Sequence, residues 1–228
     1  MSLDEEIIIK EIDKGEAARY LGYRDTLPDL NMTKLILQAE IDLLKVIKPR
    51  YCYKVFDLCR ENDSLFLAGT RLELKGDSIR KHLSDCEKAA ALCVTLSDGV
   101  DKLLRQNEVE NMVNALIIDA LANAAVEQVC DEAEKIIFRE MEGYSHTWRF
   151  GVGYGDFPLS TQKELLEIMN AGKRIGLCAT ESCILVPRKS VTCLIGIRQG
   201  ILEERKKTCK NCHLLGDCEY RRRGTTCY

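Results

Sequence analysis

The stretch RFGVGYGDFPLSTQKELLEIM, residues Arg149–Met169, interrupts a chain that is otherwise rich in helix-forming residues. It contains three alternating glycines: Gly151, Gly153 and Gly155. Glycine permits backbone conformations and a close ligand approach that a side chain would prevent. Arg149 has a planar guanidinium that can bind a carboxylate or a phosphate through two parallel hydrogen bonds. Because the spacing matches neither the P-loop nor the dinucleotide fingerprint, the residues alone leave two interpretations: a ligand-binding loop or an irregular turn between two helices.

Helical and strand patterns flank this stretch at irregular intervals. Helical periodicity covers residues 14–23, 31–49, 76–86 and 108–141, and a further helix opens after Ser160, a suitable N-cap. Branched and aromatic runs predict strands at 51–59, 65–74, 88–96, 174–180 and 190–197. We expect the last two strands to pair as an antiparallel unit. The irregular order predicts an α+β fold rather than an alternating parallel sheet.

Composition and charge exclude several classes of protein. The chain has 228 residues and a net charge of −3, so it lacks the basic field that drives non-specific nucleic-acid binding. We expect no membrane span, because no uninterrupted apolar run approaches the roughly 18 residues required, and the acidic start does not resemble a signal peptide. The sequence therefore predicts a cytoplasmic protein with neither a nucleic acid nor a membrane as partner.

The predicted helix over residues 108–141 has a polar ladder, formed by Asp119, Asn123, Glu127 and Asp131. Residues four apart lie on one side of a helix. One interpretation is a solvent-exposed face. The other is that one of these side chains binds the cationic group of a ligand.

The twelve cysteines fall into two groups. Eight are scattered through segments that resemble a folded body, over residues 1–205, and we expect most of them to be small buried hydrophobes. The other four form a C-x2-C-x5-C-x8-C pattern in the polar tail, residues 206–228: Cys209, Cys212, Cys218 and Cys227. This clustering predicts a metal site, either zinc or an iron–sulfur cluster, with reactive thiols or disulfides as the alternative. His213 is a possible substitute ligand.

The glycine-rich stretch and the segments after it resemble the activation domain of cobalamin-dependent methionine synthase. The similarity rests on Arg-x-Gly-x-Gly-Tyr at 149–154, Thr-Glu-Ser at 180–182, Pro187, and Ser-Val-Thr at 190–192. It is specific over residues 149–197. The resemblance implies a mainly antiparallel sheet with packed helices, to which the Cys-rich tail is appended.

The resemblance also implies a binding site for S-adenosylmethionine. Arg149 would bind the carboxylate of this ligand, Glu127 its ammonium, and the backbone of Phe150 and Gly151 its adenosine, with Tyr154 packed nearby. The complete predicted site is Glu127, Arg149, Phe150, Gly151, Gly153, Tyr154 and Glu181.

The chain departs from that family at two places. After the tyrosine the family has Pro-Ala-Cys-Pro-x-His, whereas residues 155–160 here read GDFPLS, and an aliphatic residue near Ile195 replaces a tyrosine. The chain has no room for the other synthase domains. We therefore expect a stand-alone relative that binds S-adenosylmethionine and acts in trans on a methionine synthase or another corrinoid protein.

In this interpretation the partner presents the cobalamin, and an electron-transfer protein is a possible second partner. Whether the chain is itself an enzyme is left open. The alternatives are a diverged methyltransferase or redox protein on the same fold, and a structural metal protein.

Overall fold

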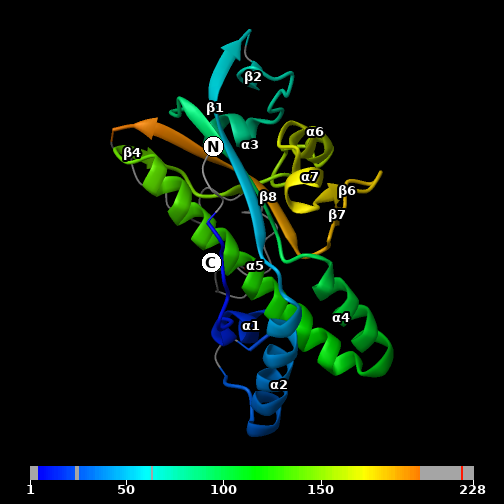
Figure 1. Ribbon diagram of the computed structural model, residues 1–228. Helices are drawn as coiled ribbons and strands as arrows, with labels where there is room; N and C mark the ends of the chain where they lie inside the picture. The colour runs from blue at the N-terminus through cyan, green and yellow to red at the C-terminus, as the bar shows by residue number, and fades with distance from the viewer. Residues whose placement is uncertain (1–4, 24–25, 63, 201–221, 223–228) are drawn as a thin grey trace.

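The computed structural model describes residues 5–23, 26–62, 64–200 and 222. Its centre is a six-stranded antiparallel sheet in the order β2-β1-β3-β8-β4, with the short strand β5 also paired to β8 (Figure 1). The strands of this sheet are β1 (Arg50–Glu61), β2 (Ser64–Leu67), β3 (Lys88–Thr95), β4 (Tyr144–His146), β5 (Phe150–Gly151) and β8 (Ser190–Gln199). The predicted α+β class with a mainly antiparallel sheet is confirmed.

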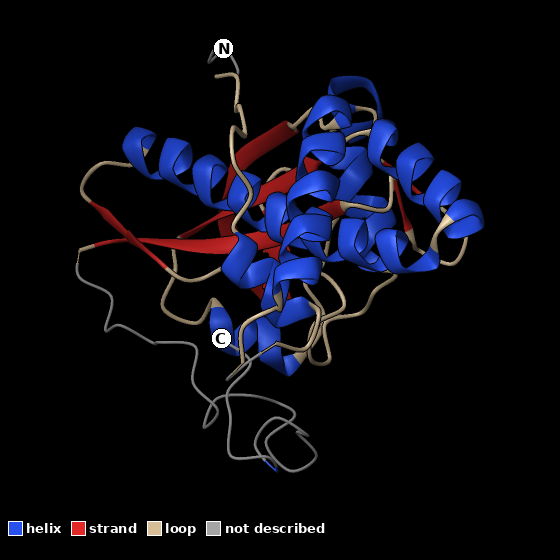
Figure 2. Cartoon of the chain, turned by 90° about the horizontal axis from the view of Figure 1, so that it is seen from below, coloured by secondary structure: helices blue, strands red, loops and turns tan. Residues whose placement is uncertain are grey.

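Helices cover both faces of the sheet. The first face packs against α1 (Lys14–Tyr20), α2 (Leu30–Val46), α4 (Asp98–Glu110) and α5 (Met112–Glu140). The second packs against α3 (Asp77–His82), α6 (Thr161–Ile168) and α7 (Ala171–Ile175). Figure 2 shows these helices packed against strands that run through the middle of the molecule.

The central strand β3 contributes side chains to both cores. Ala90, Leu92 and Val94 belong to the core under α5, and the alternate residues Ala89, Ala91 and Cys93 belong to the core under α3 and α6. Side chains alternate between the two faces of a strand, so a strand covered on both faces is apolar throughout. This is why residues 89–94 form an unbroken apolar run.

The long helix α5 satisfies the length and composition expected of a membrane span, with a mean hydropathy of 1.3 over its most apolar window. The search for uninterrupted apolar runs did not reveal this helix, because polar residues such as Asp119 and Asn123 interrupt it. However, 61% of that window is buried inside the molecule. The apolar side chains of α5, such as Leu121 and Val129, form the core against β3 and β8.

The prediction of one continuous helix over residues 108–141 is also wrong. Asn111 has an extended backbone, and its side chain accepts a hydrogen bond from the N–H of Asn114 at 3.2 Å. An asparagine side chain that bonds the backbone locally ends one helix and begins the next. The chain thus forms α4 and α5, and α4 begins at Asp98, where the sequence favours a loop.

Two strand predictions need correction. The run 65–74 is not one strand: β2 ends at Leu67, and the chain folds back on itself so that the N–H of Leu74 donates to the carbonyl of Leu65 at 2.7 Å. Residues 174–180 and 190–197 do not pair with each other. Instead β6 (Cys178–Ala179) pairs with β7 (Leu185–Val186), because β8 is already paired to β3 along one edge and to β4 and β5 along the other.

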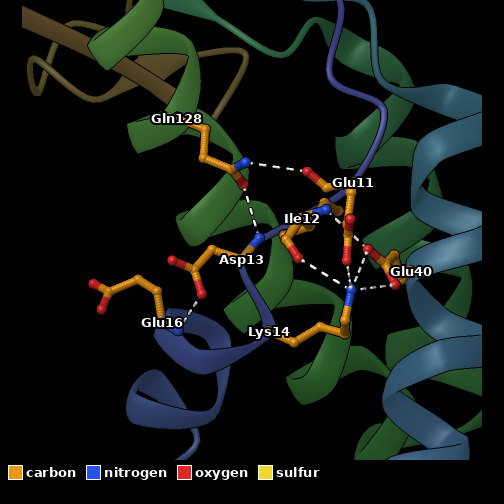
Figure 3. A network of polar contacts seen from close by, with 7 residues as sticks. All are labelled: Glu11, Ile12, Asp13, Lys14, Glu16, Glu40 and Gln128. Carbon is orange, nitrogen blue, oxygen red and sulfur yellow. Dashed lines mark hydrogen bonds and ion pairs between the residues drawn. The ribbon is translucent and has the colours of Figure 1, made fainter.

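The N-terminal segment is fixed across α2 and α5 by side chains (Figure 3). Gln128 of α5 accepts from the N–H of Asp13 at 3.0 Å and donates to the carbonyl of Glu11 at 3.1 Å. Buried Glu40 of α2 accepts from the N–H of Ile12 at 2.8 Å. Gln128 is adjacent to Glu127, so this network holds α1 beside the polar ladder of α5.

Candidate functional site

The strand β5 begins directly after Arg149 and ties the glycine-rich stretch to the centre of the sheet. Phe150 and Gly151 pair with Leu194 and Cys193 of β8. The Phe150 side chain is buried in the core under α3 and α6. Successive side chains along a strand point to opposite faces of the sheet. Because Phe150 is buried on one face, the preceding Arg149 is directed toward α5 on the other face.

Arg149 binds three carboxylates of α5. Its Nη1 donates to Asp131 Oδ1 at 2.8 Å and to Glu134 Oε2 at 2.7 Å, and its Nη2 donates to Glu127 Oε2 at 2.9 Å. These acids are spaced i, i+4 and i+7, which places them on one face of the helix. We call these four residues the arginine cluster.

The arginine cluster is partly removed from water. The side chains of Arg149 and Glu134 are 19% and 18% exposed, whereas Glu127 and Asp131 are 43% and 57% exposed. Burial raises the pKa of Glu134 to about 7, and the nearby Arg149 charge only partly opposes this rise. Burial lowers the pKa of Arg149, but the carboxylates around it more than compensate, so its pKa lies above the ordinary value.

The other half of the polar ladder binds a lysine. Lys189, whose side chain is 10% exposed, donates to Asp119 Oδ1 at 2.7 Å and to Asn123 Oδ1 at 2.7 Å. The ladder is therefore only in part a solvent-exposed face: Asp119, Asn123, Glu127 and Asp131 all contact a cation from another segment. The two cations precede β5 and β8 respectively, so the ladder positions the starts of two neighbouring strands.

Glycine occupies positions 153 and 151 of the loop for different physical reasons. Gly153 has φ +86°, and a Cβ there would lie 2.9 Å from Leu159 Cδ1, so the fold itself requires glycine. Gly151 has no such requirement. Among the residues that the structure describes, a Cβ at Gly151 would meet only the carbonyl oxygen of Thr192, at 3.9 Å, so their packing leaves space beside this residue.

The segment after Tyr154 fastens the loop to α3. The Asp156 carboxylate accepts from the N–H groups of Asp77 and Ser78 at 2.7 Å and 2.9 Å. A hydrogen bond from the Ser78 side chain, together with these two backbone hydrogen bonds, lowers the pKa of Asp156 to about 2. Gly76 holds the N-cap position of α3, so no side chain at that position can accept a hydrogen bond from the helix. The Ser160 side chain likewise makes no capping hydrogen bond to α6.

A comparison with solved structures identifies this architecture. The chain superposes on the crystal structure of the MetH reactivation domain bound to AdoHcy with a TM-score of 0.60 and 16% sequence identity, covering 94% of this chain and 82% of that one. The chain has the reactivation-domain fold. Neither the known protein families nor the curated proteins give a match to the sequence.

On this reactivation-domain fold, the predicted site residues separate into groups. Glu127 and Arg149 are in direct contact. Phe150, Gly151, Gly153 and Tyr154 continue from Arg149 along the same loop, and the Tyr154 ring packs edge-on against Phe150 with ring centroids 5.4 Å apart. Glu181 is exposed in the turn between β6 and β7, and within the described ranges no hydrogen bond or ion pair joins it to the arginine cluster.

Sequence reasoning missed Glu134. It lies three residues after Asp131, on the face that the polar ladder had already defined, so helical spacing was a usable signal. Its low exposed fraction, 18%, results from tertiary packing and was not readable from the sequence.

The four predicted metal ligands, Cys209, Cys212, Cys218 and Cys227, lie outside the described residues. Within the described ranges no group of three or more histidine, cysteine or acidic side chains could hold a metal ion. The metal site in the tail therefore stays a prediction.

Proposed function

We propose that this chain is an S-adenosylmethionine-binding reactivation module that acts in trans on a cobalamin-carrying methionine synthase or another corrinoid protein. The arginine cluster is the observation on which the proposal rests. A guanidinium set among three carboxylates matches a zwitterion, because the ligand carboxylate can bind the cation while the ligand ammonium binds the anions. The similar fold of a domain that binds AdoHcy supports the same ligand class.

The arrangement of β5 suggests how the remainder of the ligand binds. Arg149 would take the carboxylate and Glu127 the ammonium at one end of the strand. The adenosine would then lie along the backbone of Phe150 and Gly151, where the space beside Gly151 allows close approach. Tyr154, half-buried against Phe150, would bound this pocket.

The altered loop over residues 155–160 does not by itself indicate changed chemistry. Asp156 is engaged with the backbone of α3, so the replacement in this loop has a structural role on the side away from Arg149. The contacts of Asp156 with α3 therefore do not involve Arg149 or Gly151.

The chemistry would come from the two bound groups. S-adenosylmethionine would supply a methyl group from its sulfonium to the reduced cobalamin of the partner, and the broken S–CH3 bond would leave S-adenosylhomocysteine. The residues of this chain would bind and orient the ligand so that its sulfonium faces the docked partner. We place the protein in the cytoplasm, with an electron-transfer protein as the source of the reducing electron.

The first test is calorimetric titration of S-adenosylmethionine into the purified protein and into the Arg149→Ala variant. We expect saturable binding that is lost in the variant, because the ligand carboxylate would have no cationic partner. Arg139→Ala is the matched control, since Arg139 is an exposed arginine of an α5 ion pair, with Glu5. Equal affinity in the wild-type protein and Arg149→Ala would show that the site lies elsewhere.

The reactivation role needs a second measurement. A methionine synthase lacking its own activation domain would be given reductant, S-adenosylmethionine and this chain, and its recovery of activity from the oxidised state would be followed. We expect recovery only with the chain present. Binding of the ligand without recovery would favour a diverged methyltransferase on the same fold.

A further inference from the structure

Glu134 occupies the place on Arg149 that the proposed ligand needs. Its carboxylate lies 2.7 Å from Nη1, and it is the most buried of the three acids. Both N–H groups of Nη1 and one N–H group of Nη2 are engaged by the three acids. A ligand carboxylate that forms parallel hydrogen bonds with Nη1 and Nη2 must therefore compete with Glu134 and its neighbours. In this arrangement the cluster's own acids accept the hydrogen bonds that a ligand carboxylate would accept from Nη1 and Nη2.

We propose that Glu134 is a positioning residue that controls access of the ligand carboxylate to Arg149, so that ligand binding is coupled to proton uptake by Glu134. This inference rests on the proposed function. When ionised, Glu134 competes for the guanidinium. When protonated, it releases Arg149 and can donate a hydrogen bond to the incoming carboxylate.

The surroundings of Glu134 make it the member of the arginine cluster whose protonation changes near neutral pH. Arg149 faces it from the start of β5, and Asp131 and Glu127 face it from its own helix. On β8 the neighbouring Cys193 thiol is buried, which raises its pKa to about 12, so this thiol stays neutral. Cys130, also buried on α5, has a raised pKa and stays neutral as well.

Because the raised pKa of Glu134 is about 7, the coupling between ligand binding and protonation can be measured near neutral pH. Such a group is mostly protonated near about pH 6 and mostly ionised near about pH 8. If only the protonated form admits the ligand, affinity falls by about tenfold over this interval. Glu134→Gln imitates the protonated form and should remove the dependence.

The test is calorimetric titration of S-adenosylhomocysteine at about pH 6 and about pH 8. The wild-type protein, Glu134→Gln and the matched control Glu132→Gln, an exposed glutamate of the same helix, would be compared. We expect Glu134→Gln to bind at the higher pH about tenfold more tightly than the wild-type protein, and the two to converge at the lower pH. The affinities of the variant and the wild-type protein are compared at the same pH, so any titration of the ligand itself affects both equally and cancels. Thermal unfolding would verify that the variants fold.

A second probe separates this role from a general effect on the pocket. 5′-Methylthioadenosine has no carboxylate, so Glu134→Gln should leave its affinity unchanged at both values of pH. Parallel pH profiles of the wild-type protein and Glu134→Gln with S-adenosylhomocysteine would overturn the role of Glu134 and leave the proposed function standing. Absence of S-adenosylhomocysteine binding by all proteins at both values of pH would overturn both.

Discussion

At the scale of single residues, two glycines of the same loop serve different purposes. Gly153 has a left-handed backbone and Leu159 crowds the place of its absent side chain. Gly151 sits in a strand with space beside it. The fold therefore explains the first glycine, and the proposed ligand explains the second.

Substitution by alanine should separate the two roles. We expect Gly153→Ala to lower the free energy of unfolding by about 1–2 kcal/mol, because a side chain at positive φ is strained. Gly151→Ala should leave that free energy nearly unchanged and weaken S-adenosylmethionine binding by about tenfold or more, since its methyl group would enter the space for the ligand. Denaturant unfolding and calorimetry measure the two quantities. Unchanged affinity in Gly151→Ala would show that the adenosine does not bind beside this strand.

At the scale of elements, α3 depends on a residue that is distant in the sequence. Its N-cap is Gly76, which has no side chain to accept a hydrogen bond, and Asp156 satisfies the first N–H groups from 79 residues further along the chain. A carboxylate at a helix N-terminus also interacts favourably with the helix dipole. The helix and the loop after Tyr154 are therefore expected to hold or lose their structure together.

This contact should appear as pH-dependent stability. The pKa of Asp156 is lowered from 3.8 to about 2 in the folded protein, so its stabilisation is present above about pH 4 and is lost as the pH falls through about 2. Asp156→Asn should melt below the wild-type protein at neutral pH, and the gap should close over that acid interval. Asp77→Asn, which alters an exposed carboxylate of the same helix, is the control. A gap that stays constant down to about pH 2 would contradict a role for the charge of Asp156.

Also at this scale, α5 has two functions. One side is apolar and forms the core under β3 and β8. On the other side, the polar ladder binds Lys189 and the three acids of the arginine cluster bind Arg149, so the helix fixes the starts of β8 and β5 relative to each other. The proposed ligand site would thereby be built on a helix and a strand rather than on a loop alone, which favours a preformed geometry.

At the scale of the whole molecule, the sheet has one core on each face, and the tail containing the four clustered cysteines follows the body. If the tail binds zinc or an iron–sulfur cluster, Cys209→Ala combined with Cys212→Ala should abolish bound metal and leave the thermal unfolding of the body unchanged. Elemental analysis and the visible spectrum of anaerobically purified protein measure the metal. Full metal occupancy in the double variant would refute the assignment.

The sequence by itself determined the fold class, the apolar faces of the main helices and the order of residues in the Arg-x-Gly-x-Gly-Tyr loop. These features are local, because periodicity and residue type are set by neighbours along the chain. It also placed Glu127 four residues from Asp131 on one helical face.

Only the tertiary structure decided which groups meet. The contacts of Arg149 with Glu127, Asp131 and Glu134, of Lys189 with Asp119, and of Asp156 with α3 join segments that are 15 to 79 residues apart. The pairing of β8 with β3, β4 and β5 was likewise missed, because several strands of similar composition compete for the same edge. Burial, and with it the raised pKa of Glu134, depends on these long-range contacts, and local sequence does not encode them individually.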